Sequence, residues 1–288
     1  MFHEPTTLNC KGQLLMLDQP VVMGILNVTP DSFSDGGQFV DIHNAFAQAE
    51  KMIKEGAQII DVGGMSSRPG APIISVDEEI QRVIPIIQKI HEAYPQTILS
   101  IDTVHGLVAE KAIAAGASIV NDISAWSIDP GLLDVVVKHR VPYVLMHMRG
   151  KPENMQDQPA YENVALEVLD FLIEKITFLR KQGLVDIIID PGFGFGKTLT
   201  QNYDLLNRLH TFKMLEAPIL AGISRKSMIY KLLETSPKEA LTGTIALNWV
   251  ALEQGAKILR VHDVQEAKEI IEVFLKIQAT KPNGHGPF

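Results

Sequence analysis

The sequence has little cysteine and no long hydrophobic run, and each shortage excludes a class of protein. Cys10 is the single cysteine among 288 residues, so neither an intramolecular disulfide nor a cluster of metal-bound thiolates can form. A reducing compartment is indicated. No apolar run reaches the roughly 18 residues of a membrane-spanning helix, and residues 1–12 are too polar for a secretory signal. We therefore expect a soluble, cytoplasmic protein without a membrane partner.

Positive charge is also in short supply. Lysine and arginine number 26 against 34 aspartate and glutamate residues, which gives a net charge of −8 and a pI near 5.6. A nucleic-acid partner would require a basic patch, so this balance argues against one, although it is compatible with a local cationic pocket for a small anion. The sequence also lacks a G-x-G-x-x-G motif after its first apolar run, which argues against a dinucleotide-binding sheet.

Eight short apolar runs of the strand type alternate with segments of helical spacing. The runs lie at 21–27, 57–64, 97–102, 117–122, 141–148, 186–190, 217–224 and 256–263. Helices are expected at about 41–55, 76–94, 104–115, 130–139, 161–182, 200–209, 238–254 and 264–278, with a further one starting near 225. Each connection is long enough for a crossover. Eight such units favour an α/β fold, the (β/α)8 TIM barrel, over an open doubly wound sheet, which stays the alternative because a strand count does not show closure.

Both ends of the chain lie outside these units. Residues 6–19 predict a short β-hairpin that turns at Lys11 and Gly12, ahead of the main fold. The length and the 46% share of hydrophobic residues suit one large domain or two ordinary ones. From the eight units we predict a single barrel domain over 1–280 and a flexible polar tail over 281–288.

The segment 186–198 shows how a strand end could carry function. An apolar run leads into Asp190, and a proline, three glycines, two phenylalanines and Lys197 follow. Such a run is typical of a strand that is buried on both faces in a parallel sheet. The chain then presents a carboxylate, an aromatic ring and a cation at the carboxyl end of the strand, which is where α/β proteins bind ligands.

Polar side chains follow the other expected strands, and they form two sets. The first set could complete the hydrogen-bonding pattern of an amino-substituted heterocycle, and it comprises Asp102, Asn121, Asp190 and Lys226. The second set is rich in cationic donors, as a phosphate or diphosphate site should be, and it comprises Asn27, Arg68, Arg260 and His262. Asn27 offers a neutral oxygen of the kind that Mg²⁺ accepts beside substrate phosphates.

Several of these residues also have a simpler structural interpretation. Asp102 and Asp122 each precede an expected helix, where aspartate can serve only as an N-cap, and for Asp102 we weigh the two roles equally. His147 is interpreted as a satisfied interior histidine, and Met148 as a core residue that could also floor a ring-binding slot. Lys226 opens a helix, where a cation opposes the dipole, and this local cost suggests a ligand.

Together the strand ends resemble those of the dihydropteroate synthase family. The matching stretches span nearly the whole chain in order: MGILNVTPDSFSDGG (23–37), DVGG with SSRPGA (61–71), SIDT (100–103), AGASIVNDIS (115–124), MHMRGKPENMQ (146–156), DPGFGFGKT (190–198), GISRKSM (222–228) and LRVHDV (259–264). Any one stretch would be weak evidence, whereas the ordered set is specific.

The resemblance implies a transferase of folate biosynthesis. Such an enzyme condenses 6-hydroxymethyl-7,8-dihydropterin diphosphate with p-aminobenzoate to give 7,8-dihydropteroate and diphosphate. It further implies Mg²⁺ as cofactor, a homodimer and a target of sulfonamides. Because an aromatic amine is a weak nucleophile, we expect departure of diphosphate to lead, in an SN1-like displacement.

Carried over residue by residue, the resemblance assigns overlapping groups of side chains. The pterin site would comprise Asp102, Asn121, Met148, Asp190 and Lys226. The diphosphate site would comprise Asn27, Ser67, Arg68, Arg260 and His262, with the metal at Asn27. The p-aminobenzoate site would comprise Phe33, Ser67, Arg68, Pro69, Phe195, Ser224 and Lys226. The catalytic set would be Asn27, Asp35, Arg68, Lys226, Arg260 and His262. Loops 28–40 and 64–75 would close over the site.

One stretch departs from the family pattern, which often reads Glu-Ser-Thr-Arg-Pro-Gly after the paired glycines. Here Met65 replaces the glutamate and Ser67 the threonine. We hypothesise that the change alters loop packing and the sulfonamide response more than the chemistry. Two alternatives are weighed against the synthase: the pterin-binding barrel of a corrinoid-dependent methyltransferase, which should lack the SRPG and GISRK segments, and a non-catalytic pterin-binding module, which should have a broken anion site.

Overall fold

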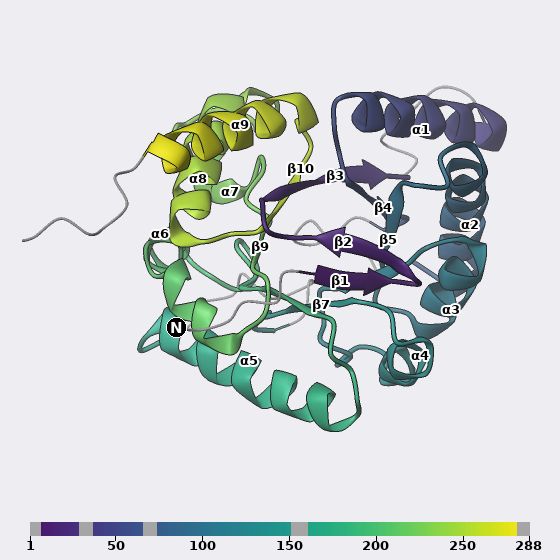
Figure 1. Ribbon diagram of the computed structural model, residues 1–288, viewed down its shortest axis with the longest axis horizontal. Coiled ribbons are helices and arrows are strands. Elements are labelled where there is room, and N and C mark those ends of the chain that lie inside the picture. Colours follow the sequence, from purple (N-terminus) through teal and green to yellow (C-terminus); the bar gives the residue numbers. More distant parts are fainter. Residues whose placement is uncertain (1–6, 29–36, 66–73, 151–160, 281–288) are drawn as a thin grey trace, which may run out of the picture.

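Parallel strands at the centre of the fold form one eight-stranded sheet in the order β8-β7-β6-β5-β4-β3-β10-β9 (Figure 1). The computed structural model describes residues 7–28, 37–65, 74–150 and 161–280. The strands of this sheet are β3 (Val21–Asn27), β4 (Ile59–Gly63), β5 (Ile98–Asp102), β6 (Ile119–Asp122), β7 (Tyr143–Met146), β8 (Ile187–Asp190), β9 (Leu220–Ala221) and β10 (Ile258–Val261). Each was expected from an apolar run, and the structure trims most of the runs at their ends.

The two edges of the sheet meet, so the sheet is a barrel. Ile189 of β8 forms a parallel bridge with Ile219, which lies directly before β9. The amide N–H of Ile189 donates to the carbonyl of Pro218 at 2.9 Å. The predicted (β/α)8 barrel is therefore confirmed, and the open doubly wound sheet is set aside.

Helices surround the barrel and connect successive strands (Figure 1). They are α1 (Gly37–Lys54), α2 (Val76–Ala93), α3 (Gly106–Ala115), α4 (Gly131–His139), α5 (Val164–Lys181), α6 (Leu199–Asn207), α7 (Ser227–Tyr230), α8 (Leu241–Gln254) and α9 (Val264–Thr280). Local chemistry sets their ends. The side chain of Ser75 accepts from the amide of Glu78 to begin α2, and Thr198 and Gln201 form a capping box at α6. In the described part of the chain, no helix is long and apolar enough to cross a membrane.

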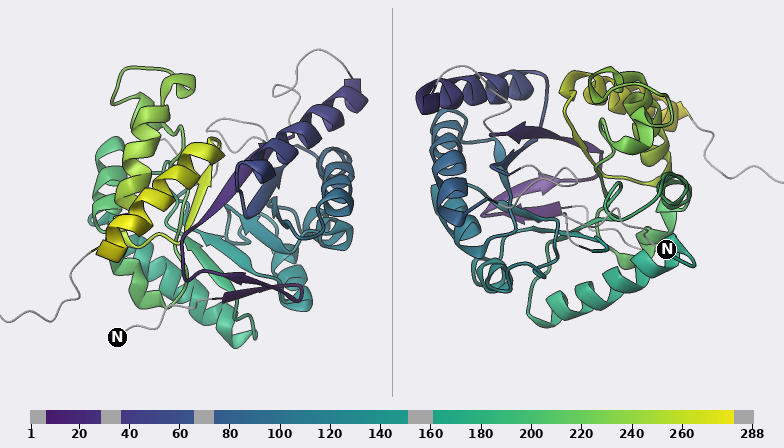
Figure 2. Two further views of the ribbon diagram at one scale, coloured as in Figure 1. Left: turned by 45° about the horizontal axis from the view of Figure 1, so that its top comes forward. Right: turned by 180° about the vertical axis from the view of Figure 1, so that it is seen from behind.

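The expected N-terminal hairpin is present as β1 (Thr7–Cys10) and β2 (Gln13–Met16), an antiparallel pair. Its turn residues Lys11 and Gly12 have positive φ values of 54° and 93°, as a tight hairpin turn requires. Figure 2 shows the hairpin crossing one end of the barrel. Its buried side chains pack into the barrel, in one apolar cluster with the amino-terminal parts of the strands. The hairpin is thus the plug of the barrel's amino end rather than an appendage ahead of it.

Two stretches differ from the expected elements. The run at 217–224 yields only the two-residue β9, because the chain turns away at Gly222 and reaches a left-handed conformation at Arg225 with φ 55°. The helix expected to start near 225 is the short α7, and the residues before β9 form a 3-10 helix, η2 (Leu209–Leu215), with a second, η3 (Pro237–Glu239), before α8. The predicted tail at 281–288 lies outside the described residues.

Candidate active site

A network around Arg260 joins four strands at the carboxyl end of the barrel. The guanidinium of Arg260, on β10, donates from Nε to Asp61 Oδ2 at 2.7 Å and from Nη2 to Asp102 Oδ2 at 2.5 Å. Asn121 Nδ2 donates to the same oxygen of Asp61 at 2.9 Å. Asp61 is fully buried on β4, and its Oδ1 has no partner among the described residues. A buried carboxylate oxygen that lacks a donor is an acceptor available to a ligand.

Negative charge exceeds positive charge around Asp102. Burial raises the pKa of Asp102 to about 7, the charge of Arg260 opposes the rise, and Asp61, Glu79 and Asp122 add to it. Near neutral pH this carboxyl group can therefore gain or lose a proton. Asp102 does not cap the helix that follows, because the carboxylate of Asp129 accepts from the first amide of α3. The N-cap interpretation of Asp102 was wrong, and its partner is the arginine.

Asp122 differs from its neighbour Asn121 in that its carboxylate bonds to a turn of the backbone. Its carboxylate accepts from the amides of Ser124 and Trp126 and from the hydroxyl of Tyr143, at 2.6–2.7 Å. These bonds hold a turn in which Ala125 and Trp126 both have positive φ, a conformation that costs energy for such residues. Asp122 thus stabilises the turn after β6, and in doing so it fixes the strand end that carries Asn121.

Asp190 and Lys226 face each other across the junction of β8 and β9. A Cβ placed on Gly222 would lie 3.7 Å from Asp190 Oδ2 and 3.8 Å from Lys226 Nζ. Lys226 Nζ donates to the carbonyl of Phe193 at 2.5 Å and lies 4.5 Å from the centre of the Phe195 ring. Burial lowers the pKa of Lys226 to about 8, against the opposing charge of Asp190. The ammonium therefore lies beside Asp190 and Phe195 at the carboxyl end of the barrel. This position agrees with the expectation that a lysine at a helix N-terminus, where it opposes the helix dipole, is kept there for a ligand.

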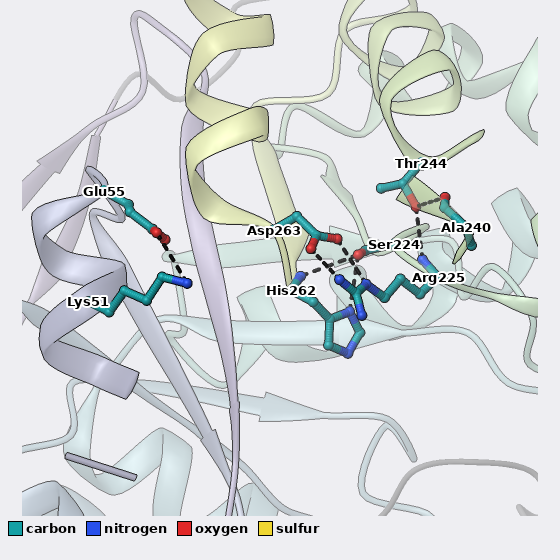
Figure 3. A network of polar contacts seen from close by, with 8 residues as sticks. All are labelled: Lys51, Glu55, Ser224, Arg225, Ala240, Thr244, His262 and Asp263. Atoms are coloured by element: carbon teal, nitrogen blue, oxygen red, sulfur yellow. Dashed lines mark hydrogen bonds and ion pairs between the residues drawn. The ribbon is translucent and has the colours of Figure 1, made fainter. Parts of the chain in front are cut away.

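Ser224 and His262 form a third group, which Figure 3 shows in detail. Ser224 Oγ accepts from the backbone N–H of His262 at 3.2 Å and lies 3.0 Å from His262 Nδ1. The next residues along each chain segment, Arg225 and Asp263, form an ion pair, with Arg225 Nε donating to Asp263 Oδ2 at 2.9 Å. The left-handed backbone at Arg225 is held by a bond from its N–H to Thr244 Oγ1. The ion pair joins the loop after β9 to the loop after β10.

Two of the remaining predicted site residues, Asn27 and Met148, lie in the described part of the chain. Asn27 ends β3, and its Oδ1 lies with the side chain of Asp102 beside Gly63. Met148 packs against an apolar cluster at the same end of the barrel that contains Phe195 and Met65. Outside the described residues lie Phe33, Asp35, Ser67, Arg68 and Pro69.

Two buried side chains of this region were missed as site residues. Asp61 interrupts an apolar strand, and that charge in a buried run was the available signal. Lys197 was noted as a cation at a strand end, but its burial was not foreseen; it is 3% exposed and lies 3.1 Å from His147 Nδ1. That contact agrees with the interpretation of His147 as a satisfied interior histidine.

A parallel α/β barrel with convergent buried charges at its carboxyl end defines an enzyme of the TIM-barrel class. Comparison with known proteins gives the family. A model of the family described as "Pterin binding enzyme" matches residues 23–262. The dihydropteroate synthase of Escherichia coli strain K12 is 46% identical over 275 residues, which are 95% of this chain and 97% of that protein.

Solved structures give the same result. The Yersinia pestis dihydropteroate synthase in a sulfonamide drug complex superimposes with a TM-score of 0.90 at 40% identity, over 95% of this chain and 100% of that one. The Xanthomonas albilineans dihydropteroate synthase with 4-aminobenzoic acid superimposes with a TM-score of 0.90 at 43% identity, over 96% and 99% of the two chains. The chain belongs to the pterin-binding enzymes and, among them, to the dihydropteroate synthases. The predicted family is confirmed.

Proposed function

We propose that this enzyme condenses 6-hydroxymethyl-7,8-dihydropterin diphosphate with p-aminobenzoate to form 7,8-dihydropteroate and diphosphate. The observation that carries this proposal is the pair of polar groups at the carboxyl end of the barrel. Asp61, Asp102 and Asn121 offer carboxylate and amide oxygens from one side. Asp190 and Lys226 offer a carboxylate and an ammonium from the other. This combination suits the amino-pyrimidinone edge of a pterin, which presents both donors and a carbonyl acceptor.

The second substrate is assigned to the side of Lys226 that carries Phe195 and Ser224. The Phe195 ring is 7% exposed and lies under the lysine ammonium, so it provides an apolar wall for an aromatic amine. Ser224 adds a hydroxyl group that is already oriented by the backbone of His262. A relative with 4-aminobenzoic acid bound superimposes over nearly the whole chain, which supports this assignment.

Diphosphate is assigned to Asn27, Arg260 and His262, together with Ser67 and Arg68 beyond the described residues. No group of three or more His, Cys, Asp or Glu side chains in the described ranges could hold a metal ion by itself. Mg²⁺ often binds through one or two protein oxygens plus substrate phosphates and water, so the Asn27 Oδ1 beside Asp102 fits it. When bound, Mg²⁺ would neutralise the charge that builds on the departing diphosphate.

The reaction is a displacement at the exocyclic methylene carbon of the pterin. The C–O bond to diphosphate breaks, the amine nitrogen forms the new C–N bond, and the amine loses one proton. Arg260 and His262 would stabilise the departing charge, and the apolar wall around Phe195 would exclude water that could otherwise trap the electron-poor carbon. Since the amine is a weak nucleophile, bond breaking leads. No covalent intermediate with the protein is required.

The test is a coupled measurement of diphosphate release and dihydropteroate formation, with Mg²⁺, in the presence and absence of p-aminobenzoate. Release that is matched by product is the expected result, and slow release without the amine would support early departure of diphosphate. Binding of the pterin substrate without any release would overturn the synthase in favour of the non-catalytic module.

A homodimeric state and a cytoplasmic location remain predictions. The last helices were expected to offer the contact surface of the dimer, and Val273 and Ile277 on α9 are 55% and 42% exposed. Sedimentation of the purified protein should give the mass of two chains. A monomer at micromolar concentration would contradict this prediction.

A further inference from the structure

Lys197 is a buried cation that the proposed reaction does not use. Its Nζ donates to the carbonyl of Gly192 at 2.8 Å and to the carbonyl of Phe195 at 3.1 Å, and it lies 3.1 Å from His147 Nδ1. Only 3% of the residue is exposed. A lysine is rarely buried to this extent without a specific set of partners.

The partners match a protonated lysine. An ammonium has three N–H donors, and the two carbonyl oxygens and the imidazole nitrogen supply three acceptors within 3.1 Å, with the His147 carbonyl as a more distant fourth at 3.5 Å. His147 can accept because burial, assisted by the charges of Lys197 and Arg149, lowers its pKa to about 2 and keeps its ring neutral. A neutral amine has two N–H groups and one lone pair, so after loss of the proton Lys197 could keep all three contacts only if the His147 ring changed to the tautomer that donates from Nδ1.

The segment that Lys197 binds has little conformational preference of its own. Gly192, Gly194 and Gly196 all have positive φ, between 62° and 81°. A Cβ on Gly192 would come within 1.9 Å of the His147 carbonyl oxygen, and one on Gly196 within 2.4 Å of the Arg149 carbonyl oxygen. The turn therefore packs directly on the segment after β7, and it depends on side-chain bonds to stay there.

Asn202 of α6 is the second anchor of the turn. Its Oδ1 accepts from the amide of Gly194 at 2.7 Å, and its Nδ2 donates to the carbonyl of Lys197 at 3.1 Å. Lys197 and Asn202 thus bond to different backbone groups of the same turn. Between their bonds lie the carbonyl of Phe193 and the ring of Phe195, which are the two contacts that this turn makes with the Lys226 ammonium.

We propose that Lys197 is a positioning residue for the second substrate: its bonds to Gly192, Phe195 and His147 fix the Phe195 ring and the Lys226 ammonium in the geometry that p-aminobenzoate requires. This inference rests on the proposed function. Lys197 contacts neither substrate in this scheme and acts through Phe195 and Lys226. Of the pterin contacts, Asp61, Asp102 and Asn121 lie on other strands, whereas Asp190 and Lys226 adjoin the turn. Phe195, in the p-aminobenzoate site, is bonded directly by Lys197.

The first experiment compares Lys197→Met with Lys197→Arg and with Lys181→Met, an exposed lysine on α5. Methionine fills the volume of the lysine stem without donating, so we expect KM for p-aminobenzoate to rise about tenfold. KM for the pterin diphosphate should rise less, by about threefold at most, because Asp61, Asp102 and Asn121 keep their positions. Arginine keeps a protonated donor and should recover part of the loss. Lys181→Met should match the unmodified enzyme.

The split between the two KM values separates positioning from mere stability. If Lys197→Met lowered the melting temperature but left both KM values unchanged, the lysine would be structural and the proposal would fail. It would fail also if both KM values rose equally. If the unmodified enzyme and Lys181→Met formed no dihydropteroate at all, the proposed function would be wrong instead, and the two failures are thereby distinguished.

A second measurement, the pH dependence of KM, is made first on the unmodified enzyme. Burial lowers the pKa of Lys197 to about 7, Asp190 opposes the change, and Lys226 and Arg149 add to it. The charged and titratable groups that face Lys197 are therefore these three and His147. KM for p-aminobenzoate should rise several-fold between about pH 6 and pH 9 as the ammonium loses its proton. Lys197→Arg should show a smaller rise, because of the two lysines that contact the turn at residues 192–198 only Lys226 then titrates in this range. A flat profile for the unmodified enzyme would contradict the proposal.

Discussion

The two ends of the barrel are built from the same strands and differ in nearly every chemical respect. At the amino end, Ile98, Ile119, Ile188 and Ile258 pack with the hairpin in one apolar cluster. Two residues further along each strand stand Ser100, Asn121, Asp190 and Arg260. Two residues of a strand span about 7 Å, and side chains two apart point to the same face. A single step along the interior thus separates a closed apolar layer from the site.

The difference shows where stability and activity are located. The inner face of the plug is complete in itself, since the side chains that face the barrel are apolar and buried. Even Cys10 has its pKa raised to about 12, mainly by burial, and stays protonated. The carboxyl end holds charges that water no longer solvates, and Asp61 Oδ1 still lacks a donor among the described residues. Charged groups are kept there at a cost in stability, and a substrate would complete their bonds.

The largest effect is expected from Asp102→Asn. Loss of the charged acceptor should lower kcat/KM about a thousandfold. Because burial raises the pKa of Asp102 to about 7, the folded state binds more protons than the unfolded state below that pH, so stability falls as pH rises towards 7. The asparagine variant should escape this fall and melt no lower than the unmodified enzyme near pH 8. Asp134→Asn, at an exposed acid on α4, is the control. A lower melting temperature at that pH would contradict the assignment of strain to this carboxylate.

The opposite outcome is expected in the plug. Leu15 is 5% exposed and its neighbour Leu14 is 62% exposed, so the two provide a matched pair. Leu15→Ala should cost about 2–5 kcal/mol of unfolding free energy through lost burial and a cavity, with kcat/KM of the folded protein unchanged. Leu14→Ala should change stability by less than about 0.5 kcal/mol. Denaturant titration and steady-state kinetics test both, and a large loss of kcat/KM in Leu15→Ala would show that the ends are coupled.

A smaller effect on rate is expected where the two loops are joined by Arg225 and Asp263. Arg225→Ala removes the ion pair that holds Ser224 beside His262, and kcat/KM should fall about tenfold. Arg225→Lys keeps the charge but not the two-pronged geometry, so it should recover only part of the rate. Full activity in the alanine variant would mean that Thr244 and the backbone alone position the loop.

The smallest effect is expected from a substitution of Met65, the residue that replaces the glutamate of the family pattern. The side chain is 9% exposed and belongs to the apolar cluster that includes Phe195. Met65→Glu should change the inhibition constant of a sulfonamide about threefold and kcat less than that, with Met65→Leu as the apolar control. If both quantities stayed unchanged in the glutamate variant, the hypothesis about this substitution would be wrong.

Most of the fold was readable because the interior strands are short apolar runs that alternate with amphipathic helices. The hairpin was also predictable, from its turn residues Lys11 and Gly12, but its packing against the amino end of the barrel was not. Leu8, Leu15 and Leu17 show only that one face is apolar, and the surface that covers it comes from strands spread over the whole chain. The short β9 was overestimated because an apolar run does not reveal that the chain must turn at Gly222.

The positions of candidate site residues were predictable where a polar residue ends or follows a strand, as at Asn121, Asp190 and Lys226. Arg260 was assigned to the anion set, and its ion pairs with Asp61 and Asp102 were not foreseen, because sequence spacing says nothing about which side chains meet across a barrel. The burial of Lys197 depends on a turn of three left-handed glycines around it, which no local pattern predicts. Contacts between side chains on different strands depend on how the strands close into the barrel, so only the three-dimensional structure shows them.

That closure is uneven around the circumference. Between β8 and β9 the barrel is joined by the bridge of Ile189 with Ile219, whereas β3 and β4 pair over five residues. This junction should therefore be the part of the barrel that opens most readily by local unfolding. Its backbone amides should be among the first of the barrel to exchange with deuterium. Asp190 ends β8 on one side of this junction, and Lys226 follows β9 on the other. A molecule that bonds to both residues would link the two strands, so ligand binding should suppress local opening between β8 and β9 and slow deuterium exchange there.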